Sequence, residues 1–441
     1  MRSTLDAMKL GLAVSTAVAL CGAASGAANA GGFAIREQSA QFQGSSFAGN
    51  AAGGGLSSMF WNPAALGQAG AGLTSESHFA GIWGQANNTV ETRDGVDAEF
   101  LLFGDESGNI GIPALVGASY YSYKLSDRLT LGMSMNSGFG LSTKPRDLNY
   151  LGAELGRTTK LFTLNAAPTM AYKIAPGITV GAGVQMQYAK GKLQVATGGP
   201  PGPTSQYKGD DFAFGFTAGI LIEPTSTTSI GLGYRSQLSH ELEGRFRTAA
   251  AGTSIEAEAG IDLPDIVTLS IRQSLAPNMR LLGSIEWSNW SRFEDLTLTS
   301  TAAGSVVGVG GLPSGVSFAS IPANWSDGWF FALGGEYDLN PAMTLRAGVA
   351  YELSPVDSAE KRIVTIPDND RVWLSAGASI KLTETMSADF AYTHVFIKNG
   401  DFDRESLTGV PITGHTEAQA DIFAASLKTT WGGGRPLEPM K

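Results

Sequence analysis

Long stretches in which apolar residues alternate with small or polar ones are the feature that most restricts the fold of this chain. In 178–188, one face reads Ile, Val, Ala, Val, Met, Tyr and the other Thr, Gly, Gly, Gln, Gln. Stretches 212–222, 230–238 and 371–382 repeat the pattern. A period of two residues is that of a β-strand. Segments of this length suit a tilted membrane strand of ~9–11 residues better than a globular strand of ~5–6.

The alternating segments predict fourteen strands. We expect them at 72–84, 114–124, 128–141, 158–173, 177–191, 210–223, 227–242, 264–275, 279–292, 326–339, 342–354, 370–382, 386–398 and 417–431. Tryptophans near the segment ends, among them Trp287, Trp290, Trp325, Trp329 and Trp373, are candidates for the aromatic girdles that flank a membrane.

The connections between these segments alternate in length. Short ones such as 126–127 and 224–226 follow the even segments, and long ones such as 192–209 and 243–263 follow the odd segments. Outer-membrane barrels have an even strand number, short periplasmic turns and long outer loops. The sequence therefore predicts an all-β fold, a 14-stranded antiparallel transmembrane β-barrel with both termini in the periplasm. A soluble β-sandwich has no reason to sort its loops in this way.

The first thirty residues have the features of a secretory signal. A basic start (Arg2, Lys9) precedes an apolar run at 10–20, and Ala28-Asn29-Ala30 fits the small-x-small cleavage pattern. The run is shorter than the ~20 residues that span a bilayer. We expect residues 1–30 to be a signal peptide. The one cysteine, Cys21, lies inside it, so the mature chain would contain no disulfide.

Residues 31–70 differ in composition from the rest of the chain. They are rich in Gly, Ala, Ser, Gln and Asn, and Arg36 and Glu37 are their only charged residues. Such a segment cannot bury enough apolar surface to fold alone. It is either a disordered arm or a hatch, a plug held inside the lumen of the barrel. The barrel itself would span 71–431, with a flexible C-terminal tail at 432–441.

The polar residues contain no recognisable catalytic or metal site. The four histidines are scattered, and no His or Cys has metal-ligand spacing. A hydrolase whose Ser and His meet from distant strands remains an alternative. The formal net charge of −10 disfavours a nucleic-acid partner. We therefore expect no enzyme activity, cofactor or metal.

Several motifs along the chain occur in the same order as in a known family. Asn62-Pro63-Ala64 resembles a hatch motif, and the other matching stretches are 139–143, 234–236, 263–265, 287–291, 325–333, 354–356 and 366–377. On these residues the chain resembles the FadL family, outer-membrane porters of long-chain fatty acids with relatives that take up aromatic hydrocarbons.

The resemblance implies a mechanism and a set of site residues. A hydrophobic ligand would enter from outside, bind in the plugged barrel and leave sideways through a kink in the third strand. The glycines in that strand are Gly132, Gly138 and Gly140. Tyr188-Ala189-Lys190 matches a family step whose basic residue faces the ligand, so Lys190 is the expected carboxylate anchor. The expected pocket wall consists of Phe33, Ile35, Phe60, Trp61, Phe139 and Phe162.

One departure from the family leaves the ligand class open. A second basic residue of the fatty acid porters is replaced here by Ser326. We expect a monomeric porter in the outer membrane of a Gram-negative bacterium, in contact with its lipid, that takes up long-chain fatty acids or similar hydrophobic molecules passively. Uptake of neutral aromatic hydrocarbons by the same route is the main alternative. A general diffusion porin would need an open lumen.

Overall fold

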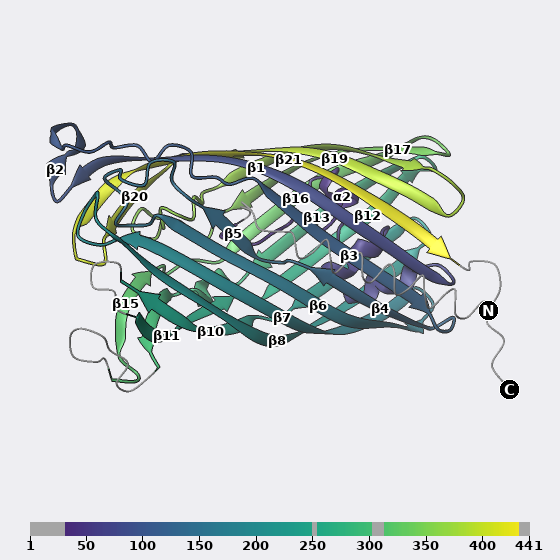
Figure 1. Cartoon of the computed structure of the whole chain (residues 1–441). Helices are drawn as coiled ribbons and strands as arrows, with labels where there is room; N and C mark the ends of the chain where they lie inside the picture. Colours follow the sequence, from purple (N-terminus) through teal and green to yellow (C-terminus); the bar gives the residue numbers. More distant parts are fainter. Residues whose placement is uncertain (1–30, 249–253, 302–312, 432–441) are drawn as a thin grey trace.

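The computed structural model describes residues 31–248, 254–301 and 313–431, so the predicted signal peptide and C-terminal tail lie outside the described residues. Its strands form one antiparallel sheet that closes on itself (Figure 1). Strand β1 (Leu73–Arg93) pairs with β3 (Ala114–Lys124) along one edge and with β21 (Pro411–Trp431) along the other. The closed sheet is a 14-stranded barrel, as the alternation predicted.

Interruptions divide several of the wall strands in two, and each pair counts as one strand of the barrel. The wall strands are β1, β3, β4 (Leu129–Asn136) with β5 (Gly140–Thr143), β6 (Thr158–Ala175), β7 (Ile178–Ala196), β8 (Thr204–Thr225), β9 (Thr228–Arg235) with β10 (Leu238–Arg247), β11 (Ser254–Leu263) with β12 (Ile266–Ala276), β13 (Met279–Ser288) with β14 (Asp295–Ser300), β15 (Ser317–Pro322) with β16 (Gly328–Asn340), β17 (Met343–Leu353), β18 (Arg371–Lys381), β19 (Met386–Ile397) with β20 (Gly400–Glu405), and β21. Short strand β2 (Val96–Asp97) pairs with the end of β1, and the single-turn helix η3 (Ala98–Phe100) follows it in the connection to β3. A second single-turn helix, η4 (Trp290–Arg292), lies in the interruption between β13 and β14.

The strands run further on the long-loop side than predicted. Strand β1 continues to Arg93 rather than ending near residue 84, and most of the predicted loops 192–209 and 243–263 belongs to strands β7, β8, β10 and β11. These extensions were missed because their exposed faces carry charged residues such as Arg245 and Glu256, which remove the apolar alternation. Only the part of a strand in contact with lipid needs an apolar outer face. The short connections are confirmed, for example at 176–177 between β6 and β7.

The two faces of the wall have opposite character. Outward-facing Phe212, Phe214 and Phe216 of β8 are 65%, 72% and 52% exposed. Inward-facing Gln185 and Gln187 of β7 are buried. An apolar exterior with a polar interior is the inverse of a soluble protein and matches a barrel surrounded by lipid. No helix in the described part of the chain is long and apolar enough to cross a bilayer.

Residues 31–69 contact the inward faces of strands on opposite sides of the barrel. They contain helix α2 (Ala40–Gln43) and two 3₁₀ helices, η1 (Leu56–Phe60) and η2 (Pro63–Gln68). The side chain of Gln43 donates to the carbonyl of Ile422 in β21 (3.2 Å), and the backbone N–H of Ala51 donates to Ser270 in β12 (3.1 Å). Figure 1 shows α2 among the strands of the wall.

Inward-facing glycines let this segment approach the wall closely. A Cβ atom on Gly233 of β9 would lie 1.8 Å from the carbonyl oxygen of Trp61, and one on Gly231 would lie 1.9 Å from that of Ala51. On β17, a Cβ atom on Gly348 would lie 2.1 Å from the carbonyl oxygen of Ser45. Glycine in a strand often marks the close approach of another backbone. The glycines of these strands therefore fit the wall to the N-terminal segment.

Replacing Gly233 by valine should destabilise the folded protein, because the new side chain collides with the backbone at Trp61. Overpacking of this kind typically costs about 1–3 kcal/mol. The measurement is the temperature at which the compact band of an unboiled sample is lost in a denaturing gel. Gly260→Val is the matched control, because nothing lies within 4 Å of a Cβ atom at Gly260. Equal midpoints for the two variants would contradict the close fit.

Candidate functional site

The third wall strand is interrupted where the kink was expected. Strand β4 ends at Asn136 and β5 begins at Gly140. Strand β3 pairs with β4 through 119–124, but its other half, 114–118, has no ladder to β5 within the described residues. Gly138 and Gly140 lie at this interruption. Gly132 lies within regular pairing, where a Cβ atom would be 2.8 Å from the side chain of Leu66.

The start of the N-terminal segment pairs with this interruption. The N–H of Ile35 donates to the carbonyl of Gly138 (2.9 Å), and the N–H of Gly140 donates to the carbonyl of Phe33 (2.9 Å). Ala34 and Phe139 form the antiparallel bridge between these two bonds. Residues 33–35 thus bind backbone groups that the neighbouring strand leaves unpaired.

An aromatic cluster surrounds Phe33. We define the outer aromatic cluster as Phe33, Phe139, Trp290, Phe293 and Trp325, all buried. The ring centroid of Phe33 lies 4.8 Å from that of Trp290, 5.5 Å from that of Phe293 and 6.4 Å from that of Phe139. Their mostly edge-to-face arrangement is the one that aromatic rings favour. The cluster is a compact apolar site directly beside the strand interruption.

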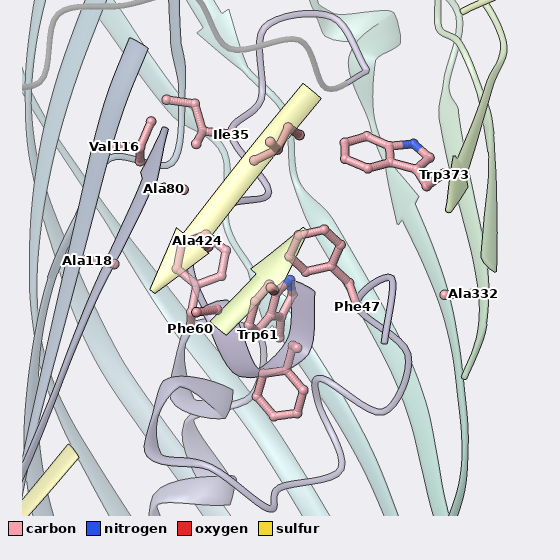
Figure 2. Packing of buried hydrophobic residues seen from close by; sticks show 14 of the residues in the cluster. Ile35, Phe47, Phe60, Trp61, Ala80, Val116, Ala118, Ala332, Trp373 and Ala424 are labelled. Atoms are coloured by element: carbon pink, nitrogen blue, oxygen red, sulfur yellow. The ribbon is translucent and has the colours of Figure 1, made fainter. Parts of the chain in front are cut away.

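A second group of rings packs deeper around helices α2 and η1. We define this inner aromatic cluster as Phe42, Phe47, Phe60, Trp61, Phe330 and Trp373. Figure 2 shows Phe60 beside Trp61, with Phe47 lying toward Trp373 on the opposite side. The centroids of Phe60 and Trp61 are 5.1 Å apart, and those of Phe47 and Trp373 are 6.0 Å apart. Ile35 also belongs to this buried group, so residues 33–35 connect the two clusters.

Asn62, Pro63 and Ala64 fix the end of the N-terminal segment to the wall. The Asn62 side chain accepts from the N–H of Ala64 (3.0 Å) and caps η2, whose first residue is Pro63. Its amide donates to the carbonyl of Ala51 (2.9 Å) and to that of Ile220 in β8 (3.0 Å). Proline suits the first position of a helix because the N–H it lacks would have no partner there.

A buried ion-pair group holds the start of the segment. The guanidinium of Arg36 lies 2.6 Å from Glu286 on β13 and 3.1 Å from Glu352 on β17. Trp373 donates its ring N–H to Glu352 (3.1 Å). Breaking such a group by removing one partner leaves an uncompensated buried charge. Its geometry therefore ties residues near 36 to the wall.

Two of the predicted site residues face the other way. Lys190 lies opposite Phe162 in the β6–β7 ladder, and it is exposed. Side chains alternate between the two faces along a strand. Lys190 therefore points outward, as exposed Met186 does, and Phe162 points outward because its neighbour Thr163 points inward. The structure therefore brings Phe33, Ile35, Phe60, Trp61 and Phe139 together inside the barrel, but not Lys190 or Phe162. The role of Lys190 stays a prediction.

Three rings of the outer aromatic cluster were not predicted. They are Trp290, Phe293 and Trp325. Trp290 and Trp325 were expected in a membrane girdle, but both are buried. Trp373 of the inner aromatic cluster was also expected there and is buried as well. Phe293 follows η4, and Trp325 lies just before β16. Trp290 and Trp325 lie in stretches that resemble the family, but the alternation along the chain gives no sign that barrel closure brings them to Phe33. Within the described ranges, no group of three or more His, Cys, Asp or Glu residues could hold a metal ion.

Comparison with known proteins shows which family has this architecture. The model of a family of outer membrane protein transport proteins (OMPP1/FadL/TodX) matches residues 21–431. The chain belongs to this family. It is therefore a protein of the Gram-negative outer membrane. Family members are transporters, which agrees with the lack of a catalytic motif in the sequence.

The curated relatives include an outer membrane protein and a fatty acid transport protein. Outer membrane protein P1 of Haemophilus influenzae is 27% identical and is aligned over 92% of this chain and 96% of that protein. The long-chain fatty acid transport protein of Escherichia coli (strain K12) is 27% identical, over 68% of this chain and 76% of that protein.

Solved structures confirm the fold of the FadL family. A Pseudomonas aeruginosa FadL homologue superposes with a TM-score of 0.80 at 23% identity, covering 91% of this chain and all (100%) of that one. The Ralstonia pickettii toluene transporter TbuX gives a TM-score of 0.63 at 17% identity, covering 90% and 100%.

Replacing Asn62 by alanine should loosen residues 56–69, because the cap on η2 and both hydrogen bonds to carbonyls are lost. Loss of a cap alone costs about 0.5–2 kcal/mol. We expect amide hydrogen exchange in this stretch to rise about tenfold or more, since ~1.4 kcal/mol is a factor of ten. Amides of β18 serve as the internal control. Unchanged protection in 56–69 would contradict the tethering role.

Proposed function

We propose that this protein takes up long-chain fatty acids or similar hydrophobic molecules passively across the outer membrane. The observation that carries the proposal is the outer aromatic cluster, a buried apolar site beside an interruption of the wall. An alkyl chain gains about 0.8 kcal/mol for each CH₂ group moved from water to an apolar site. Relatives that are long-chain fatty acid transport proteins support this class of ligand.

Residues 31–70 act as the plug of this barrel in our proposal. Their contacts with β8, β12 and β21 support this role, because a segment in that position obstructs an open water path. A general diffusion porin would need that path. The plug must shift for a ligand to pass, and a ligand can shift it only by its difference in affinity for the two states.

Lateral release through the third strand is part of the proposal, and contacts of residues 33–35 support it. A ligand that inserts between Phe33 and Trp290 competes with their packing and pulls residues 33–35 away from 138–140. The interruption would then open toward the lipid, where an apolar molecule partitions favourably. The ligand would move from the lumen into the membrane without crossing an aqueous pore.

Uptake of neutral aromatic hydrocarbons is the second candidate. It is favoured by the aromatic lining and by Ser326, which hydrogen bonds to Asp357 and Lys361 in place of a basic residue. The toluene transporters among the solved structures share the fold. Comparing oleate and toluene uptake in a strain that lacks its own porter separates the two ligand classes. Uptake of neither would contradict the proposed function.

Linking residue 34 to residue 139 should block transport reversibly. Ala34 and Phe139 are opposite each other between two hydrogen bonds, a position where Cα atoms are about 4.5 Å apart, within disulfide range. The double variant Ala34→Cys/Phe139→Cys should lose nearly all oleate uptake when oxidised and recover it on reduction. Uptake is measured with radiolabelled oleate in whole cells.

The single variant Phe139→Cys is the matched control, because it loses the same ring and cannot form the link. It should transport equally under both conditions. Full uptake by the oxidised, verified disulfide would contradict displacement of residues 33–35.

A further inference from the structure

A buried arginine faces the lumen without a carboxylate partner. Arg235 is the last residue of β9, at the point where the seventh wall strand is interrupted before β10. Its side chain points inward with Gly231 and Gly233 and is 5% exposed. No Asp or Glu of the described residues lies within the 4.0 Å ion-pair distance of its guanidinium. Arg36, by contrast, forms ion pairs with two glutamates.

All the groups that bind Arg235 are neutral. Its guanidinium donates to the carbonyl of Phe60 (3.1 Å) and to the side-chain oxygen of Gln185. Its central carbon lies 4.2 Å from the ring centroid of Phe60, a cation–π contact. Burying a charge is costly unless it is paired with an opposite charge. The guanidinium therefore has no carboxylate in direct contact among the described residues, and it keeps hydrogen-bond donors that an anion could use.

Phe60 lies between the guanidinium of Arg235 and the interruption of the third wall strand at Gly138. Its ring covers the guanidinium, and a Cβ atom on Gly138 would lie 3.8 Å from the tip of the same ring. The ring also packs against Trp61 with centroids 5.1 Å apart. The backbone of Phe60 belongs to η1, in the segment that must shift for transport. Movement of this ring would uncover Arg235 on the side of the interruption.

The surroundings define the chemical class of the anion. The outer aromatic cluster and the buried group around Phe60 are both apolar, and Ala34 packs against both, so the ligand body must be apolar. One guanidinium neutralises one negative charge, whereas a phosphate dianion would leave a buried excess charge. A carboxylate accepts two parallel hydrogen bonds from arginine, which strengthens such a pair. A long-chain carboxylate therefore fits the site.

We propose that Arg235 binds the carboxylate of a long-chain acid once Phe60 moves aside. This inference rests on the proposed function and specifies its ligand class. Sequence similarity pointed instead to Lys190, which lies on the outward face of β7. Arg235 lies on the inward face, next to both the plug and the interruption, where it gives acids an advantage over neutral hydrocarbons.

The test compares two ligands that differ only in the head group. Binding of oleate and of oleyl alcohol to the purified full-length protein is followed by quenching of tryptophan fluorescence. Arg235→Met should weaken oleate binding about tenfold or more, since a hydrogen bond to a charged group contributes about 1.5–3 kcal/mol. Oleyl alcohol should change less than about threefold. Arg245→Met, at an exposed arginine paired with Glu256, is the matched control.

Two further arms keep the outcomes distinct. Arg235→Lys retains the charge and should weaken oleate binding less than Arg235→Met does. If Arg235→Met does not fold, Arg235→Lys takes its place, and oleate should still lose more affinity than oleyl alcohol. Equal losses for both ligands, or no loss for oleate, would overturn the assignment while leaving the proposed function intact. If the unmodified protein binds neither ligand, the proposed function fails as well.

Discussion

The pairing of residues 33–35 with residues 138–140 is the contact on which the rest of the account depends. Backbone polar groups at membrane depth must find partners, because lipid offers none. The wall leaves such groups unpaired where β4 stops and β5 begins, and Phe33 and Ile35 supply the missing partners. Residues 33–35 thereby complete this part of the barrel wall. In our proposal, withdrawing these residues opens that part of the wall.

The N-terminal segment is held by few strong ties and many close contacts. Arg36 and Asn62 bind the wall at its two ends, and wall glycines let its backbone approach between them. It has little regular secondary structure, and its helices are only four to six residues long. Most of its stability therefore comes from contact with the barrel. The proposed gating needs such a segment to shift locally while the wall keeps its closed ladder.

The sequence predicts much of the wall and less of the site. Alternation and loop parity predict the strand number and the short turns, because lipid imposes an apolar outer face on each strand. The strand extensions beyond the lipid leave no such signal. Phe33 and Phe139 were predicted for the site, whereas Trp290 and Trp325 reach it only through barrel closure. Lys190 shows a different limit, since the alternation that defines β7 already places it on the face of Met186 and Tyr188.

The central claim is that ligand binding separates residues 33–35 from the interrupted strand. Hydrogen exchange at the amides of Ile35 and Gly140, with and without saturating oleate, measures this separation directly. The account predicts slow exchange at both amides in the free protein and much faster exchange when oleate is bound, with β18 unchanged. Equal or greater protection of both amides in the oleate complex would contradict it.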